Sequence, residues 1–172
     1  MSTRARSDAV EAVETAVKEA GLDVERPDAE SFVVTLPGQR KLNTMVWLGA
    51  GEHSLLVKTF FCRQPDENAA GFYRWLLQKN DAMYGMAFSA DEAGDVYIVG
   101  RLPLSGITPD EVDRLLGCVL TYSDENFNAA LERGFASSIR KEWEWRYRRG
   151  YSMRNLQAFR HLVEEDGGTA GT

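Results

Sequence analysis

The chain has 172 residues, of which 44% are hydrophobic and 27% are charged. These values are typical of an ordinary soluble domain. A chain of this length can bury roughly 70% of the surface that it exposes when unfolded. The net charge of −6 argues against general nucleic-acid binding, because nucleic-acid phosphates repel an acidic protein. The first residues lack the apolar core of a signal peptide, and no later segment approaches a membrane span. We therefore expect a cytoplasmic protein that does not contact a membrane.

The hydrophobic pattern predicts an N-terminal helix followed by three strands. From Asp8 to Ala20 the apolar residues fall on one helical face, Asp8 and Glu11 occupy capping-box positions, and Gly21 ends the helix. Three strand-like runs follow, joined by turns that contain glycine: Ser31–Leu36, Asn43–Leu48 and Ser54–Cys62. We expect these strands to form an antiparallel meander.

A second helix and two further strands come next. Pro65-Asp66-Glu67 opens this helix, because proline suits the first helical turn and acidic residues suit its positive end. The strands run from Tyr84 to Ser89 and from Val96 to Leu102, on either side of an acidic turn. A third helix begins at Thr108, where an N-cap threonine, a proline and a glutamate form a capping-box pattern.

The last part of the chain is predicted to be helical. The apolar pattern of the third helix resumes at Phe127 and continues to Tyr147, with a break near Ser123-Asp124 or Gly134. An amphipathic segment follows from Ser152 to Glu165. The tail from 166 to 172 has nothing to bury, so we expect it to be disordered. We assign residues 1–150 to one domain and residues 151–172 to a C-terminal helix and a disordered tail.

The elements follow the order α-β-β-β-α-β-β-α, with a C-terminal helical extension. This order lacks the βαβ alternation that demands a parallel sheet, so we expect an α+β fold in which helices cover an antiparallel five-stranded sheet. It is similar to the fold of type III secretion chaperones, small dimeric proteins that hold a partner polypeptide over their sheet and helices. The string FNAALERGFASSIRKEWEWR, residues 127–146, resembles the end of bacterial YbjN-domain proteins, which are labelled sensory transduction regulators.

The resemblance to the YbjN domain covers about residues 8 to 147 and consists of a packing pattern. The family is not assigned an enzymatic reaction. The resemblance therefore implies a regulatory or chaperone-like role, and it transfers no catalytic or ligand-binding residues to this chain.

The residues themselves also lack a recognisable catalytic or cofactor motif. The stretch from Gly49 to Ser54 resembles a phosphate-binding loop, but it leads into a strand rather than a helix, so we interpret it as a hairpin turn. The two histidines, His53 and His161, have no partners at metal-ligand spacing. We expect no catalytic site, no metal and no cofactor.

The acidic turn and the cysteines leave two alternatives open. Asp91, Glu92 and Asp95 could attract a hard cation, but they lack the alternating ligands of a calcium loop, so we interpret them as a solvated turn. We expect the two cysteines, Cys62 and Cys118, to be buried free thiols. Cys62 would be a nucleophile only beside a base, and a small enzyme with an unrecognised site is therefore one alternative.

The charge changes sign near the C-terminus. Between Ser138 and Arg154 there are six basic and two acidic residues, a net charge of +4, so the rest of the chain carries about −10. Trp143, Trp145 and Tyr147 lie two residues apart in this stretch, so a helix cannot direct all three toward a single core. Tryptophan, tyrosine and arginine dominate the hot spots of protein interfaces.

We expect Trp143 to continue the core stripe of Ile139 and Trp145 to point toward a second chain, a ligand peptide or the segment 152–165. The predicted partner-binding residues are Trp143, Trp145, Arg146, Arg148 and Arg149. A solvated face is the alternative for the arginines. Nucleic acid would also suit these residue types, but Glu142 and Glu144 interrupt the patch, and an acidic protein segment fits it with less conflict.

We therefore predict a non-enzymatic regulatory or chaperone-like module that binds a protein or peptide partner through its sheet and its C-terminal helix, as a homodimer. The alternatives from other classes are a nucleic-acid-associated regulator that uses the basic aromatic helix, a small enzyme, and a purely structural subunit of an oligomer.

Overall fold

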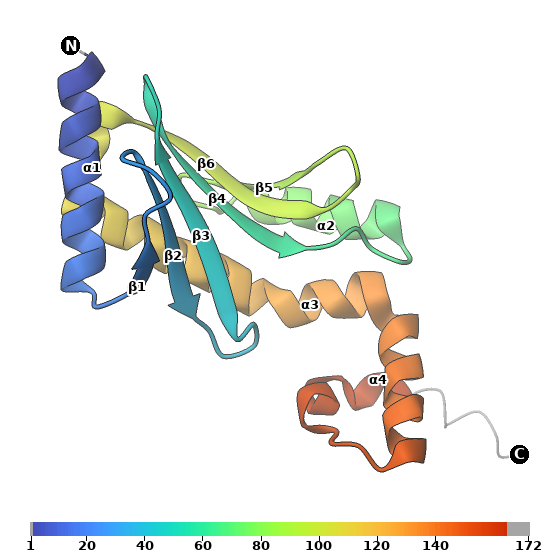
Figure 1. Cartoon of the computed structure of the whole chain (residues 1–172). Helices are drawn as coiled ribbons and strands as arrows, with labels where there is room; N and C mark the ends of the chain where they lie inside the picture. Colours follow the sequence, from blue (N-terminus) through green and yellow to red (C-terminus); the bar gives the residue numbers. More distant parts are fainter. Residues whose placement is uncertain (1, 165–172) are drawn as a thin grey trace, which may run out of the picture.

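A computed structural model of the chain describes residues 2–164 (Figure 1). Within this range the sheet has six strands: β1 (Asp23–Glu25), β2 (Ser31–Pro37), β3 (Asn43–Ala50), β4 (Ser54–Cys62), β5 (Ala87–Ala90) and β6 (Val96–Pro103). The helices are α1 (Ser2–Glu19), α2 (Ala69–Asn80), α3 (Pro109–Arg149) and α4 (His161–Glu164), with two short 3₁₀ helices, η1 (Leu104–Gly106) and η2 (Arg154–Phe159). None of the helices in this range is long and apolar enough to cross a membrane.

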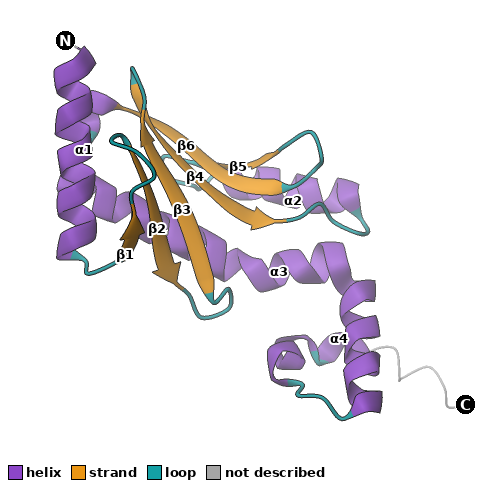
Figure 2. Cartoon of the chain, viewed as in Figure 1, coloured by secondary structure: helices purple, strands orange, loops and turns teal. Residues whose placement is uncertain are grey.

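The strands form one antiparallel sheet in the order β1-β2-β3-β4-β6-β5 (Figure 2). Side chains alternate between a buried and an exposed face: in β3, Val46 and Leu48 are buried, whereas Met45 and Trp47 are exposed. The predicted antiparallel α+β fold is confirmed, with six strands in place of five. The additional strand, β1, has three exposed residues and no apolar alternation, so its sequence carries no strand pattern.

The helices pack on the face of the sheet that carries the buried side chains. α1 and the first half of α3 contact each other and β3, and Val13, Leu48 and Leu115 share one core. α2 packs against β5 and adds Phe72 and Leu76 to this core. Each such side chain contributes about 2 kcal/mol to the free energy of folding when it is fully buried.

Two helices begin at residues other than those predicted. α1 begins at Ser2, so Asp8 lies inside it and the predicted capping box is wrong. The residues before Asp8 have no apolar stripe, but arginine and alanine favour the helix and extend it. α2 begins at Ala69 rather than at Pro65, because the backbone of Asp66 and Glu67 pairs with α3 instead.

The start of α3 matches its prediction only in part. The N-cap at Thr108 is confirmed, because its hydroxyl accepts the backbone N–H of Glu111 at 3.2 Å. The Glu111 carboxylate does not close a capping box; it accepts the hydroxyl of Tyr84 at 2.8 Å. Tyr84 belongs to the turn before β5, because its backbone N–H donates to the Tyr122 hydroxyl of α3 at 2.8 Å rather than to a neighbouring strand. β5 therefore begins at Ala87, later than the strand predicted from Tyr84 to Ser89.

α3 bends at Phe135, whose φ of −140° and ψ of 17° lie outside the helical range (Figure 1). The predicted break at Gly134 is thereby confirmed, and the alternative break at Ser123-Asp124 is wrong. The helix stays regular at Asp124, whose carboxylate reaches out to the β2–β3 loop. There one oxygen accepts three consecutive backbone N–H groups, at 2.9, 2.7 and 3.0 Å: those of Gln39, Arg40 and Lys41.

The loop before α2 supplies the hydrogen bonds that the bend removes from α3. The backbone N–H groups of Asp66 and Glu67 donate to the Gly134 carbonyl oxygen at 2.9 and 3.2 Å. Beyond the bend, Glu67 Oε1 accepts the backbone N–H of Ser137 at 2.6 Å, and Asp66 Oδ2 accepts the Ser138 hydroxyl at 2.7 Å. The end of one helical segment and the start of the next are therefore both capped from outside the helix.

Residues 136–164, called the arm below, extend away from the sheet (Figure 1). α3 ends at Arg149, and the chain turns back at Gly150, which has a φ of 66°. Of the amphipathic segment predicted from Ser152 to Glu165, the described residues 152–164 form two short helices, η2 and α4. The tail predicted to be disordered, 166–172, lies outside the described residues.

The returning chain of the arm is fixed to α3 by both apolar and polar contacts. Phe159 and Leu162 are buried and belong to the hydrophobic core. The Arg140 Nε donates to the Leu162 carbonyl oxygen at 2.9 Å, and the Arg146 Nη1 donates to the Ser152 carbonyl oxygen at 2.9 Å. These contacts show that the arm is an ordered part of the fold rather than a frayed helix end.

Gly134→Ala is expected to destabilise the protein, although alanine is the better helix former. A Cβ atom at residue 134 would lie 2.8 Å from Pro65 Cβ and 3.0 Å from the Phe72 ring, and such overpacking costs about 1–3 kcal/mol. At Gly117, in the same helix, an added Cβ meets nothing within 4 Å, so Gly117→Ala is expected to stabilise the protein by up to about 1 kcal/mol. Urea unfolding measures both changes, and a stabilised Gly134→Ala variant would contradict the close packing at the bend.

Candidate functional site

A groove of about 550 Å³ lies beside the bend of α3, and we call it the bend groove. The end of β4, both halves of α3 and η2 line it mainly with apolar side chains: Phe60, Phe61, Phe127, Leu131, Phe135, Ile139 and Leu156. A second groove of about 690 Å³ adjoins it and continues toward the loop of residues 39–43. The two grooves share three lining residues: Lys41, Phe127 and Leu131.

A β-bulge shapes the sheet wall of the bend groove. The pairing of β4 with β6 shifts between Phe60 and Cys62, so Phe60 is exposed whereas Phe61 and Cys62 are both buried. Lys41 fixes this irregular end, because its Nζ donates to the carbonyl oxygens of Phe60 and Phe61 at 2.6 and 3.1 Å. Burial lowers the pKa of Lys41 below its ordinary value, and the neighbouring Cys62 opposes this shift. Lys41 thus holds the wall of the groove together.

The other charged groups of the bend groove are also paired within the protein. Glu142 Oε1 accepts the Arg146 Nε at 2.5 Å, and Arg63 donates to both carboxylate oxygens of Asp66. Hydrogen bonds from Arg63 and then from Ser138 lower the pKa of Asp66 to about 2, so this carboxylate is ionised at neutral pH. These pairs fix the walls of the groove, so the surface that a ligand would contact is mainly apolar.

Cys62 lacks the surroundings of a nucleophile. Burial raises the pKa of its thiol to about 12, and the nearby Lys41 offsets only part of this effect. Both cysteines are free thiols, but Cys118 is only half-buried, so the prediction of burial is confirmed for Cys62 and is wrong for Cys118. Cys62 therefore acts as a small core residue.

The face of the sheet opposite the helices carries a second apolar surface, called the open sheet face. Met45 and Trp47 on β3 and Phe60 on β4 are 58%, 37% and 47% exposed. The strand register places four side chains in one row across this face: Val33, Trp47, Lys58 and Val99. Because Phe60 also lines the bend groove, the open sheet face and the bend groove are continuous.

Three of the five predicted partner-binding residues meet at the end of the arm. Trp145, Arg148 and Arg149 line a shallow pocket of about 300 Å³, together with Lys141 and Glu144. Trp145 is 46% exposed, and its ring lies 5.2 Å from the ring of Tyr151 and 5.2 Å from the guanidinium carbon of Arg149. Arg148 forms an ion pair with Glu144. We call this cluster the arm end.

The other two predicted residues, Trp143 and Arg146, lie outside this pocket. Trp143 is half-buried and not part of the buried core, so the expectation that it continues the core stripe of Ile139 is wrong. Arg146 is used internally, because it binds the Glu142 carboxylate and the Ser152 carbonyl oxygen.

The acidic turn and the glycine-rich turn have structural roles. Asp91 Oδ1 accepts the backbone N–H of Asp95 at 2.9 Å, and Asp95 Oδ1 accepts that of Gln64 at 2.8 Å. Across residues 2–164 no group of three or more His, Cys, Asp or Glu side chains could hold a metal ion. The hairpin turn predicted between β3 and β4 is confirmed, because the Gly51 N–H donates to the Ser54 carbonyl oxygen at 2.9 Å.

The bend groove was not predicted from the sequence, because its walls come from separate segments. One local signal was available in Phe60-Phe61, two bulky residues in succession that break the alternation of β4. The break predicted at Gly134 was a second signal, since a bend beside a strand end leaves side chains of both elements uncovered.

Most of the chain is similar in sequence to known proteins. The model of the YbjN family, described as "Putative bacterial sensory transduction regulator", matches residues 9–132. The uncharacterized protein Rv0487 of Mycobacterium tuberculosis is 53% identical over 132 residues, which cover 77% of this chain and 72% of that protein. The family match ends before the arm, whereas we expected the resemblance to reach residue 147.

Two solved structures are also similar. A chain of the ExsC–ExsE complex has a TM-score of 0.52 at 18% identity and covers 72% of this chain and 93% of its own length. The type III secretion chaperone SycH of Yersinia pestis, solved with a fragment of YscM2, has a TM-score of 0.48 at 14% identity and covers 67% of this chain and 96% of its own length. Both resemblances predicted from the sequence, to the YbjN domain and to the secretion-chaperone fold, are confirmed.

Cys62 is expected to resist alkylation in the folded protein. A pKa of about 12 leaves about one thiol in ten thousand ionised at pH 8. Iodoacetamide labelling at this pH, followed by mass spectrometry, should modify Cys62 only after the protein is unfolded in guanidinium chloride. Rapid labelling of Cys62 in the folded protein would contradict its burial and would favour the enzyme alternative.

Glu67→Ala is expected to loosen the arm, because the Ser137 N–H loses its acceptor. Loss of an N-cap costs about 1 kcal/mol, so amide hydrogens just beyond the bend should exchange about fivefold faster. Hydrogen-exchange mass spectrometry measures this rate. Glu125→Ala, which removes an exposed carboxylate from the first half of α3, is the control. Equal exchange in both variants would show that the bend does not depend on Glu67.

Proposed function

The chain belongs to the YbjN family, and on that premise we propose that it is a non-enzymatic regulatory or chaperone-like module that acts by binding a protein partner. The observation that carries this proposal is one continuous apolar surface, which runs from the open sheet face through Phe60 into the bend groove. Contiguous exposed apolar surface on a soluble protein marks a place where another chain binds.

In this proposal a segment of the partner lies across the open sheet face and inserts a side chain into the bend groove. Met45, Trp47 and Phe60 provide the exposed apolar contacts on the sheet, and complete burial of such a side chain contributes about 1.5–3 kcal/mol. The bend groove, at about 550 Å³, has the size of an ordinary ligand pocket. An aromatic or branched side chain of the partner fits its apolar walls.

The arm end provides a second contact of a different kind. Trp145, Arg148 and Arg149 suit an acidic protein surface, because an exposed tryptophan and two arginines combine apolar area with charge. Arg146 supports them by fixing the turn after α3. Trp143 is partly exposed on the same helix, outside the pocket of these residues.

Internal pairing favours binding over catalysis at the bend groove. Lys41, Arg63 and Glu142 each hold another group of the protein, and burial keeps the Cys62 thiol protonated. A reaction would need polar groups that converge on a substrate, and here these groups stabilise the walls.

A protein also suits the arm better than a nucleic acid does. Arg146 and Arg148 are paired with Glu142 and Glu144 on the same helix, which reduces the charge that phosphates would meet.

We propose a homodimer as the active form.

Phe60→Asp is expected to reduce partner capture by at least about tenfold, because it places a charge where the sheet face joins the bend groove. The tagged protein is recovered from the cytosol of its source cells, and bound proteins are quantified by mass spectrometry. Trp145→Ala is expected to weaken the same capture, because the arm end provides the second proposed contact.

Leu77→Asp is the matched control, because Leu77 is 69% exposed on α2 and lines none of the grooves described above. The proposal is supported by a partner protein that is captured by the wild type and by the Leu77→Asp variant but not by the Phe60→Asp variant. Two outcomes would contradict the proposal: the wild type recovers only its own chain, or all variants capture the partner equally.

A further inference from the structure

We propose that the arm end of one copy binds the groove between α1 and β1 of a second copy. This inference rests on the proposed function, because it identifies the acidic protein surface that the arm end contacts. Both surfaces belong to the same chain, and they lie at opposite ends of the molecule (Figure 1).

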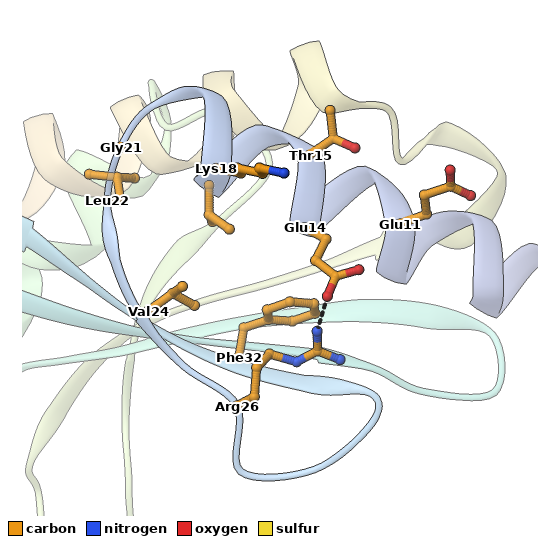
Figure 3. Close-up of a pocket in the computed structure, with 10 residues that line it drawn as sticks. Glu11, Glu14, Thr15, Lys18, Gly21, Leu22, Val24, Arg26 and Phe32 are labelled. Atoms are coloured by element: carbon orange, nitrogen blue, oxygen red, sulfur yellow. Dashed lines mark hydrogen bonds and ion pairs between the residues drawn. The ribbon is translucent and has the colours of Figure 1, made fainter.

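The groove between α1 and β1 has a volume of about 650 Å³ and an apolar floor (Figure 3). Val17 comes from α1, Leu22 from the turn that follows, Val24 from β1 and Phe32 from β2. Because β1 is an edge strand with three exposed residues, this floor lies at an accessible border of the sheet.

Arg26 gives this groove a preformed wall (Figure 3). Its guanidinium carbon lies 3.9 Å from the centroid of the Phe32 ring. Its nitrogens donate to Glu14 Oε1 at 2.6 Å and to the Ala29 carbonyl oxygen at 2.7 Å. The charges of Glu14 and Arg26 largely cancel, and the other two charged residues of the lining, Glu11 and Lys18, are also opposite in sign. The field at the mouth of the groove is therefore set by the exposed acidic residues around it.

The surroundings of the groove are strongly acidic, whereas the arm is basic. Residues 8–30 contain eight acidic residues, all exposed, and two basic ones, a net charge of −6. Residues 136–164 contain seven basic and three acidic residues, a net charge of +4. Opposite potentials on two surfaces attract them during encounter and favour their pairing over like-charged alternatives.

The side chains of the two surfaces are complementary in kind as well as in charge. The arm end presents two exposed aromatic rings in contact with each other, Trp145 and Tyr151, next to Arg148 and Arg149. The groove offers an apolar floor for a ring, and Glu11 and the exposed acidic residues around the groove offer carboxylates for the arginines. This combination of an aromatic anchor with a charged border is typical of protein interfaces.

Symmetry determines how the contact is completed. When two different surfaces of one protein bind each other, the copies can assemble into an open filament. They can also form a closed dimer, in which a two-fold axis relates the copies and each arm end occupies the groove of the other copy. We infer the closed dimer, because it fills both grooves with both arm ends, and two linked contacts bind more tightly than either alone. The contact is electrostatic in part, so it should weaken with salt as the Debye length falls from about 10 Å at 0.1 M to about 3 Å at 1 M.

Charge reversal on each surface tests this pairing in sedimentation equilibrium of the purified protein at low salt. Arg149→Glu places an acid at the acidic groove, and Glu11→Arg places a base opposite the basic arm. Each variant alone should self-associate roughly tenfold more weakly, or worse, than the wild type. An equal mixture of the two should form a mixed dimer of wild-type strength, because the reversed residues then face each other and the other contact is native.

Arg74→Glu is the control, because it makes the same charge change on an exposed residue of α2, outside both surfaces. It should leave self-association unchanged, and circular dichroism checks that every variant is folded. A monomeric wild type, a dimer that both variants retain, or a mixture that fails to recover the dimer would overturn the inference. No other protein is present in this experiment, so partner capture from the cytosol can succeed or fail independently of it.

Discussion

The bend in α3 is the constraint on which the functional surfaces depend. An unbent helix would continue in line past the sheet, at about 1.5 Å per residue. Instead the Gly134 carbonyl takes its hydrogen bonds from the backbone of Asp66 and Glu67, and Pro65 and Phe72 occupy the space that a side chain at residue 134 would need. The same loop then caps the next helical segment at Ser137. The bend groove, the direction of the arm and the place of the arm end all follow from this contact.

The course of α3 also explains how an acidic protein keeps a basic region. If the arm lay along α1, its arginines would pair with the acidic residues of 8–30 in the same chain. The first half of α3 runs from α1 to the opposite end of the molecule, where the arm begins (Figure 1), and exposed charges separated by more than about 8 Å are largely screened at physiological salt. Much of the opposite charge within reach of the arm therefore lies on the arm itself, as in the pairs Arg146–Glu142 and Arg148–Glu144. In the proposed pairing, the exposed Arg149 of the arm end lies at the acidic residues of a second chain.

The sequence predicted those features whose signal lies within one segment. The N-cap at Thr108, the alternation of β3 and the break at Gly134 are local, and all three are confirmed. Pro65-Asp66-Glu67 has the chemistry of a helix start, but its backbone and carboxylates serve α3 rather than α2, which only the tertiary arrangement decides. β1 depends on its pairing with β2, and the bend groove depends on four segments that meet in space. At the arm end the residue types were informative, but the internal role of Arg146 depends on the turn at Gly150.

The bend groove connects the two contacts proposed for this protein. Phe60 and Phe61 form its wall on the sheet, and Ile139 and Glu142 form its wall on the arm. A ligand shifts the position of an element only through a difference in its affinity for the alternative positions. A partner side chain in the groove touches both walls, so its affinity depends on where the arm lies, whereas a segment confined to the open sheet face lacks this dependence. Glu142 binds Arg146, and Arg146 holds the Ser152 carbonyl in the turn beside Tyr151, on which Trp145 packs. We therefore expect occupation of the groove and docking of the arm end to be coupled through Arg146 and the turn that it fixes.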